Sequence, residues 1–325
     1  MGKLGKLVGL IVAGVLSWGY QIVTGAPSGT YYRFGEDLKR YVASPVGVNL
    51  EVLPSHGSVE NLKLMALDPE KRFGIVQQDV IEAVKRSTNP TIRLRGELVK
   101  LLLPLYLEEV HLIVRKGAPF QKFEDLKGRK FGIIKNSGSG LTTALLAKYV
   151  LGNSVAEMVP VPSLQQGLQF LKEGKIDWIL LVCGQPCEKV QNLDPAQFKL
   201  LPFDGNRPYL SYQNVEISPA SYPNLHLQKP IPTIGVRSLL IIRDSSDTQV
   251  ASDVRKLAIQ LYKVRRLLQQ KGHPKWKEVR FQLFPIPGWR YYLPFKEGWE
   301  IGKEVSSTEG GEKCTPEKLL IGSCK

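Results

Sequence analysis

The sequence predicts an α/β protein of two lobes, each an open, mostly parallel sheet flanked by helices. Its 325 residues exceed what one compact core usually holds, so two units are expected. Strand-like apolar runs alternate with helix-like periods from about residue 20 to residue 86, and the alternation starts again at residue 131. Such alternation favours parallel sheets covered by helices.

The first strand–loop–helix unit begins with an apolar run at 20–23 and continues through a loop of small residues, 24–32. The spacing of Phe34, Leu38 and Tyr41 then predicts the inner face of a helix. Because the first N–H groups of a helix lack partners and carry the positive end of its dipole, this loop suits an anion such as a carboxylate. A plain turn without a ligand has the same pattern.

Two further strands, at 48–53 and 72–77, follow the same plan, and Ser58 is expected to cap the helix between them. Open α/β sheets bind ligands at the carboxyl ends of their strands. Three loops are therefore predicted to share that edge: 24–32, 55–58 and 77–79.

A second unit repeats the first. A strand at 131–134 leads into the small-residue loop 136–140, and Leu141, Leu145 and Tyr149 mark a helix. A later strand, 176–182, breaks just before Pro186, a favoured first helical residue.

Hydrophobic strands at 99–107, 110–114 and 233–242 bracket this second unit. They indicate that the chain crosses to a second lobe and returns. We expect residues 20–113 and 235–302 to form lobe 1, residues 114–234 to form lobe 2, and residues 303–325 to be a polar tail.

Residues 1–19 resemble a secretory signal, because Lys3 and Lys6 precede the short uncharged run 7–16. Export to the periplasm is predicted, and an uncleaved N-terminal anchor remains an alternative. The four cysteines fit an oxidising compartment. Two local disulfides are suggested, although four cysteines permit three pairings: Cys183 with Cys187, and Cys314 with Cys324.

The net charge of +14 favours anionic partners, but no nucleic-acid motif accompanies it, and residues 255–271 read as one amphipathic helix with a basic outer face. No enzyme motif, cofactor site or metal site is recognised. His111 lies in an apolar strand and is expected to be a core residue. Glu108 and Glu109 cannot act together on one substrate, because neighbours on a strand point to opposite faces.

Several motifs in order resemble the solute-binding subunits of TRAP transporters of the TAXI family. They span residues 20–292, most of the chain: 24–32 (TGAPSGTYY), 57–62 (GSVENL), 74–79 (GIVQQD), 110–115 (VHLIVR), 125–128 (DLKG), 137–140 (SGSG), 184–186 (GQP) and 287–292 (PGWRYY).

The resemblance implies a type II periplasmic binding fold, in which two α/β lobes close on a small carboxylate or amino acid such as glutamate or glutamine. It also implies delivery to a TRAP membrane permease. We expect a monomer, and the missing nucleophile–base pair argues against an enzyme. Together with His56, which lies in a strand-end loop, the motifs place ligand contacts at Thr24, Ser28, Gly29, Thr30, Tyr31, Tyr32, Gln77, Gln78, Asp79, Ser137, Gly138, Ser139, Gly140, Gly184, Gln185 and Pro186.

This chain departs from the family pattern at the rim of the site. Arg33 and His56 replace smaller residues, and Cys183 and Cys187 flank the turn at 184–186. The rim is therefore more basic than in the family pattern. A tethered sensory receptor and an enzyme on the same two-lobe fold remain the alternative functions.

Overall fold

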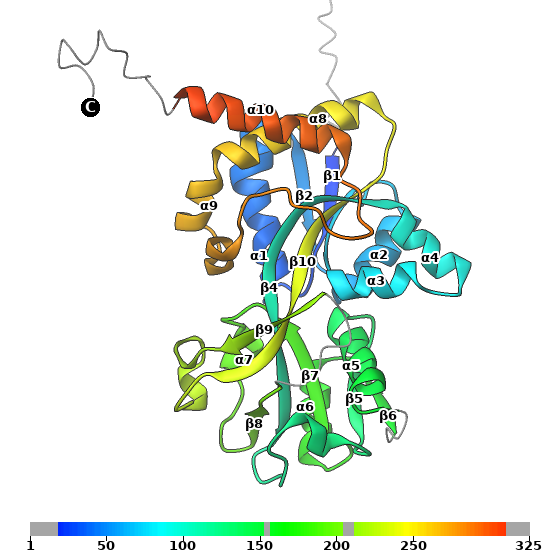
Figure 1. The fold of residues 1–325 in the computed structure, drawn as a ribbon, viewed down its shortest axis with the longest axis vertical. Coiled ribbons are helices and arrows are strands. Elements are labelled where there is room, and N and C mark those ends of the chain that lie inside the picture. Colours follow the sequence, from blue (N-terminus) through cyan, green and yellow to red (C-terminus); the bar gives the residue numbers. More distant parts are fainter. Residues whose placement is uncertain (1–18, 153–156, 204–210, 310–325) are drawn as a thin grey trace, which may run out of the picture.

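The computed structural model describes residues 19–152, 157–203 and 211–309, which form two lobes joined by long strands (Figure 1). Residues 1–18 of the expected signal or anchor, and both cysteines of the expected Cys314–Cys324 pair, lie outside the described residues. Across the described ranges, no helix has the length and apolar character needed to span a membrane.

Lobe 1 opens with strands and helices in alternation, as the sequence predicts. β3 is buried along its whole length, as expected for a strand covered on both faces. The elements are β1 (Gly19–Val23), α1 (Thr30–Asp37), η1 (Leu38–Ala43), η2 (Ser44–Val46), β2 (Asn49–Leu53), α2 (Ser58–Leu67), β3 (Phe73–Gln77), α3 (Gln78–Lys85) and α4 (Pro90–Glu97).

The start of α2 differs from the prediction. Gly57, and not Ser58, occupies the cap position, with a φ of 109° that favours glycine. Ser58 Oγ instead accepts a hydrogen bond from the Gln77 N–H at 2.9 Å. The hydroxyl therefore joins the start of α2 to the end of β3.

Two long strands connect the lobes: β4 (Val99–Arg115) and β10 (Ile231–Arg243). They pair antiparallel from Val99 with Arg243 to Glu109 with Gly235. The apolar segments predicted at 99–107 and 110–114 form a single strand, β4. Both glutamates between them are buried within it.

Lobe 2 holds the second α/β unit, followed by the loop-rich stretch expected at 202–232, of which residues 204–210 are not described. Its elements are η3 (Phe123–Leu126), β5 (Phe131–Ile134), α5 (Gly138–Tyr149), β6 (Met158–Val161), α6 (Leu164–Lys172), β7 (Trp178–Cys183), α7 (Glu188–Gln191), β8 (Phe198–Leu201), β9 (Tyr212–Ile217), η4 (Pro219–Ser221) and η5 (Pro223–Leu225).

After β10 the chain returns to lobe 1 as α8 (Thr248–Lys263), α9 (Arg265–Lys271), η6 (Pro274–Glu278) and α10 (Leu293–Glu309). The basic stretch 255–271, predicted as one helix, is divided between α8 and α9. The buried face of α8 joins the core of lobe 1 beneath it. α10 continues past residue 303, where the polar tail was expected to begin.

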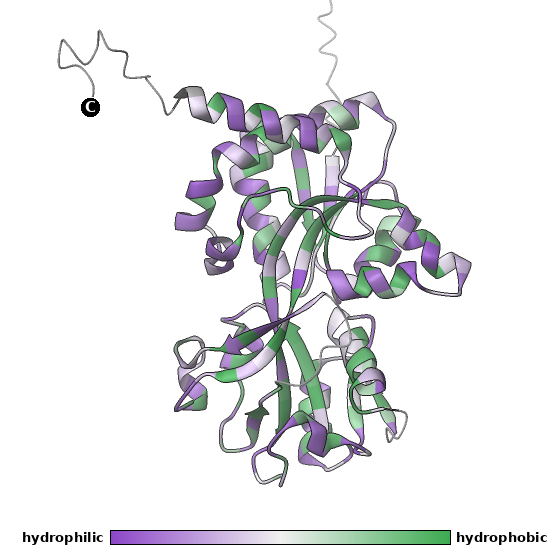
Figure 2. Cartoon of the chain, in the orientation of Figure 1, coloured by the Kyte–Doolittle hydropathy of each residue, from purple (hydrophilic) through white to green (hydrophobic). Residues whose placement is uncertain are grey.

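The strands form one ten-stranded sheet in the order β2-β1-β3-β10-β4-β7-β5-β6, with β8 on β4 and β9 on β10. Pairs between strands of the βα units are parallel, and every antiparallel pair involves β4 or β10. Figure 2 shows that the connecting strands are mainly hydrophobic, whereas α4 and α9 are mainly hydrophilic. The lobes therefore share a continuous apolar sheet.

Candidate functional site

A polar cavity of about 270 Å³ lies where the two lobes meet. Lobe 1 lines it with the starts of α1 and α2, at Thr30 and Ser58, and lobe 2 lines it with the start of α5, at 137–139. The first N–H groups of a helix have no partner within that helix. Because these helix starts meet at one cavity, they favour a bound anion.

Many residues predicted to bind the ligand line this cavity. They come from the loop before α1, the loop before α2, the end of β3 and the loop before α5. They are Ser28, Gly29, Thr30, Tyr31, His56, Gln77, Ser137, Gly138 and Ser139. The small-residue loops of the two lobes thus lie on a common cavity.

Other predicted residues support the loops from outside the lining of the cavity. Thr24 Oγ1 donates a hydrogen bond to the Leu53 carbonyl at 2.8 Å, and the Gly140 N–H donates to Ser137 Oγ at 2.9 Å. Tyr32 packs against the core of lobe 1, and Gln78 Nε2 donates to Glu82. Their side chains and backbone groups hold the loops in shape.

Asp79, also predicted to contact ligand, connects the lobes instead. Its Oδ2 accepts hydrogen bonds from Thr142 Oγ1 in α5 and Tyr212 Oη in β9, both at 2.7 Å. Burial raises the pKa of Asp79 to about 6, although these hydrogen bonds oppose the rise. The carboxylate of Asp79 therefore makes hydrogen bonds that connect the lobes.

The turn at 184–186 lies beside the cavity. Thr30 Oγ1 donates to the Gly184 carbonyl at 3.5 Å, which joins the two lobes. The Gln185 N–H donates to Glu109 at 2.7 Å, and Pro186 lines a neighbouring hollow with Arg33 and His273. The turn therefore belongs to the contact between the lobes.

Sequence reasoning missed Glu108 and Lys189, which both line the cavity. Glu108 Oε2 accepts a hydrogen bond from Tyr31 Oη at 2.5 Å. Lys189 follows the turn in lobe 2, its pKa is lowered by burial, and it forms no ion pair within the described ranges. A charged residue inside an apolar strand was a signal for Glu108, whereas nothing near Lys189 in the sequence set it apart.

Glu109, the next residue of β4, faces away from the cavity, as adjacency on a strand requires. Its Oε1 accepts a hydrogen bond from Lys275 Nζ at 2.6 Å, and both residues are buried. Lys275 also bonds Glu278 and the Leu107 carbonyl. A buried ion pair therefore joins η6 to β4.

A disulfide joins Cys183 and Cys187, and both residues line the cavity. His111 is buried, as expected, and its Nε2 lies 2.8 Å from Tyr222 Oη. Tyr222 Oη also accepts a hydrogen bond from the Cys187 N–H at 3.2 Å. His111 and Tyr222 thus support the disulfide loop from within lobe 2.

The lobes are in contact around the cavity. The Glu60 N–H at the start of α2 donates to the Asn136 carbonyl before α5, at 3.1 Å. Gly138 lies so close to lobe 1 that a Cβ on it would be 1.9 Å from Gln77 Oε1. A residue with a side chain at this position would require the Gln77 side chain to move.

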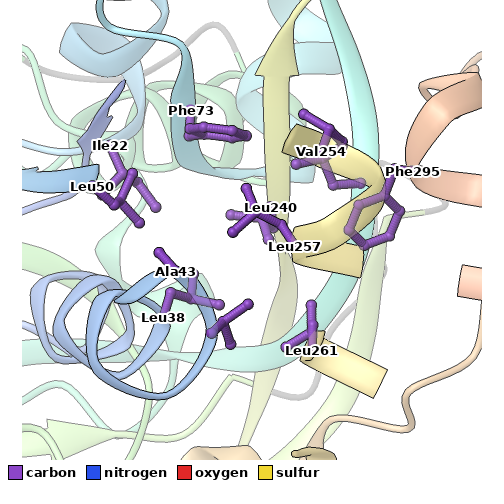
Figure 3. A pocket seen from close by; sticks show the side chains of 12 residues that line it. Ile22, Leu38, Ala43, Leu50, Phe73, Leu240, Val254, Leu257, Leu261 and Phe295 are labelled. Carbon is purple, nitrogen blue, oxygen red and sulfur yellow. The ribbon is translucent and has the colours of Figure 1, made fainter. Parts of the chain in front are cut away.

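A second hollow lies inside lobe 1, between the sheet, η1 and α8 (Figure 3). It measures about 40 Å³, and all its lining residues are hydrophobic, among them Leu38, Leu240 and Leu257. A polar solute would lose its hydrogen bonds there. The hollow belongs to the core. Among the residues of known placement, no group of three or more His, Cys, Asp and Glu side chains is arranged to hold a metal ion.

A sheet shared by two lobes, with a polar cavity where the lobes meet, defines the two-lobe solute-binding fold. The chain belongs to the NMT1-like family, whose model matches residues 22–281.

Three solved structures illustrate the likeness, which is one of fold alone. The periplasmic sulfonate-binding protein SsuA from Methylobacillus flagellatus KT is 17% identical, with 78% of this chain and 69% of that chain covered and a TM-score of 0.44. An ancestral arginine-binding protein bound to arginine is 15% identical, with 80% and 95% covered and a TM-score of 0.47. The GluR0 ligand-binding core from Nostoc punctiforme, in complex with L-glutamate, is 14% identical, with 77% and 98% covered and a TM-score of 0.47.

Proposed function

We propose that this chain is an exported receptor that captures a small anionic or zwitterionic solute between its lobes and delivers it to a membrane permease. The observation that carries the proposal is the cavity lined by helix starts from both lobes. Each helix start stabilises a nearby anion by about 0.3–1 kcal/mol at an exposed site, and by more where water is excluded. Lys189, which has no ion pair among the described residues, adds a basic group to the same cavity.

Closure of the lobes would couple binding to a change in shape. Groups from lobe 1 and lobe 2 can contact one solute together only when the lobes meet, so the solute favours the closed arrangement by its differential affinity. A permease could then distinguish the loaded receptor from the empty one.

For the transport system, we propose the TRAP type, with a small carboxylate or amino acid such as glutamate as the solute. The motifs at 24–32, 137–140 and 184–186 support this assignment. Reconstitution with a candidate permease in proteoliposomes tests it. Uptake driven by an ion gradient supports a TRAP system, whereas uptake that requires ATP indicates an ABC-type system.

The binding function is tested by thermal unfolding with a panel of solutes. We expect at least one of L-glutamate, L-glutamine, L-arginine, glutarate and a short alkyl sulfonate to raise the melting temperature, with an uncharged sugar as the control. A solute at 100 times its Kd stabilises the folded state by about 2.7 kcal/mol. No shift with any charged solute would contradict the proposal.

Lobe closure is tested by Gly138→Ala. The added methyl group would lie 1.9 Å from Gln77 Oε1 and 3.0 Å from Ser58 Oγ, so the Gln77 side chain must move before the lobes can meet. We expect the affinity to fall by about 1–3 kcal/mol, the usual cost of overpacking, and the two lobes to stay folded. Calorimetry measures the affinity, and small-angle scattering reports closure. Gly117→Ala is the matched control, because nothing lies within 4 Å of its added methyl group.

A further inference from the structure

Glu108 is a buried acid that lines the proposed binding cavity and forms no ion pair with any residue that the structure describes. Only 4% of its surface is exposed. Tyr31 Oη holds one carboxyl oxygen, Oε2, at 2.5 Å, and the other oxygen accepts no hydrogen bond within the described ranges. The nearby cation, Lys275, binds Glu109 on the opposite face of β4. One acceptor oxygen of Glu108 is therefore left for a ligand.

The surroundings of Glu108 keep it neutral while the cavity is empty. Burial raises its pKa to about 8, the hydrogen bond from Tyr31 opposes that rise, and the charges of Asp79 and Glu109 add to it. Lys275 opposes it from the far side of the strand. A buried carboxyl without a positive partner holds its proton.

Gln77 also lines the cavity. Gln77 is 2% exposed, and its Oε1 has no hydrogen-bond partner among the residues whose positions are described. β3 and β4, which carry Gln77 and Glu108, lie on either side of β10 in the sheet. The Oε1 atom is enclosed against Gly138, so the carboxyl of Glu108 is the acceptor that a ligand can reach.

We propose that Glu108 is a specificity-determining subsite for a protonated amine of the solute. The assignment rests on the proposed binding function and refines it: the solute is a zwitterion, with its amine at Glu108 and its acid group at the helix starts and Lys189. An acid, Glu108 on β4, and a basic residue, Lys189 in lobe 2, line the same cavity and match that arrangement. A dicarboxylate would bring no donor to Glu108.

Binding then releases a proton. The ammonium group of the solute keeps its three protons, and the carboxyl of Glu108 loses its own to solvent and becomes the carboxylate that pairs with it. The titratable groups around Glu108 influence how readily it loses this proton. They are Tyr31 from α1, Tyr106 and Glu109 from β4, Asp79 from α3 and Lys275 from η6.

The experiment compares matched probes on the wild type and on Glu108→Gln. The probes are L-glutamate and glutarate, and L-arginine and 5-guanidinovalerate, which differ within each pair by the α-amine. We expect the wild type to prefer the amine-bearing member of one pair, and Glu108→Gln to lose about 100-fold in affinity for it, as when a buried charge pair is broken. The affinity for the deaminated member should change by less than threefold. Calorimetry in two buffers of different ionisation enthalpy at neutral pH should show proton release on binding.

Two controls separate the outcomes. Glu51→Gln makes the same chemical change on the exposed edge strand β2 and should leave binding unchanged. Wild type that binds glutarate as tightly as glutamate, or Glu108→Gln that keeps full affinity for the amine, overturns the amine subsite while the receptor function stands. Failure of every charged solute overturns the receptor function and the subsite with it.

Discussion

Glu108 and Glu109 are neighbours on β4, yet Glu109 lies in an ion-paired site of the core and Glu108 lies at the cavity. Both are buried, with 4% and 3% of their surfaces exposed. Glu109 is fully satisfied by Lys275 and Gln185, whereas Glu108 has one tyrosine hydroxyl and an open cavity. The ion pair of Glu109 stabilises the fold on one face of β4, and the cavity beside Glu108 on the other face suits a ligand. The partner of a buried acid, and not the acid itself, decides its role.

The largest effect is expected on the paired face. Lys275→Met leaves Glu109 buried without its cation and should destabilise the protein by about 3–5 kcal/mol. Urea unfolding measures the loss. Lys303→Met removes an exposed pair with Glu300 on α10 and should change stability by less than about 1 kcal/mol. A loss at Lys275 no greater than that at Lys303 would mean that the two faces of β4 do not differ in this way.

A smaller effect is expected on the cavity face. Tyr31→Phe removes the hydroxyl that holds Glu108 and should weaken binding of an amine-bearing solute by about tenfold, near the net value of one hydrogen bond to a charged group. Calorimetry measures the affinity. Tyr41→Phe, in η1 of lobe 1, is the control and should bind as the wild type does. If the apo protein loses as much stability with Tyr31→Phe as with Lys275→Met, the hydroxyl is structural and the contrast fails.

A third effect concerns pH and the protein without solute. The pKa of Glu108 rises from its ordinary 4.5 to about 8, chiefly through burial, so the folded chain binds this proton more tightly than the unfolded chain does. The contribution of this proton to the free energy of unfolding is fully present below pH 4.5 and is lost as pH rises through 8. Asp79, with a pKa raised to about 6, acts in the same direction at lower pH.

We therefore expect the melting temperature of the wild type to fall between pH 5 and pH 8 by more than that of Glu108→Gln. Differential scanning calorimetry at the two pH values, without solute, measures the difference. Parallel curves for the two proteins would show that Glu108 does not hold its proton in the folded state.

The sequence alone determined the parts of this protein that depend on local order. In the motifs at 24–32 and 137–140, a stretch of small residues leads from a strand into a helix whose first N–H groups have no partner within that helix; α1 begins at Thr30 and α5 at Gly138. Repetition of that unit predicted two lobes, and the long hydrophobic segments predicted that the chain crosses and returns. These features depend on spacing that can be read along the chain.

Only the tertiary structure decided which charged groups meet. Glu109 and Lys275 lie 166 positions apart in sequence, and Asp79 and Tyr212 lie 133 apart, so no local pattern could pair them. Strand alternation predicted that Glu108 and Glu109 face opposite ways, but not which face receives η6 and which faces the cavity. That choice depends on how distant elements pack around β4, and it leaves Glu109 with a cation and Glu108 without one.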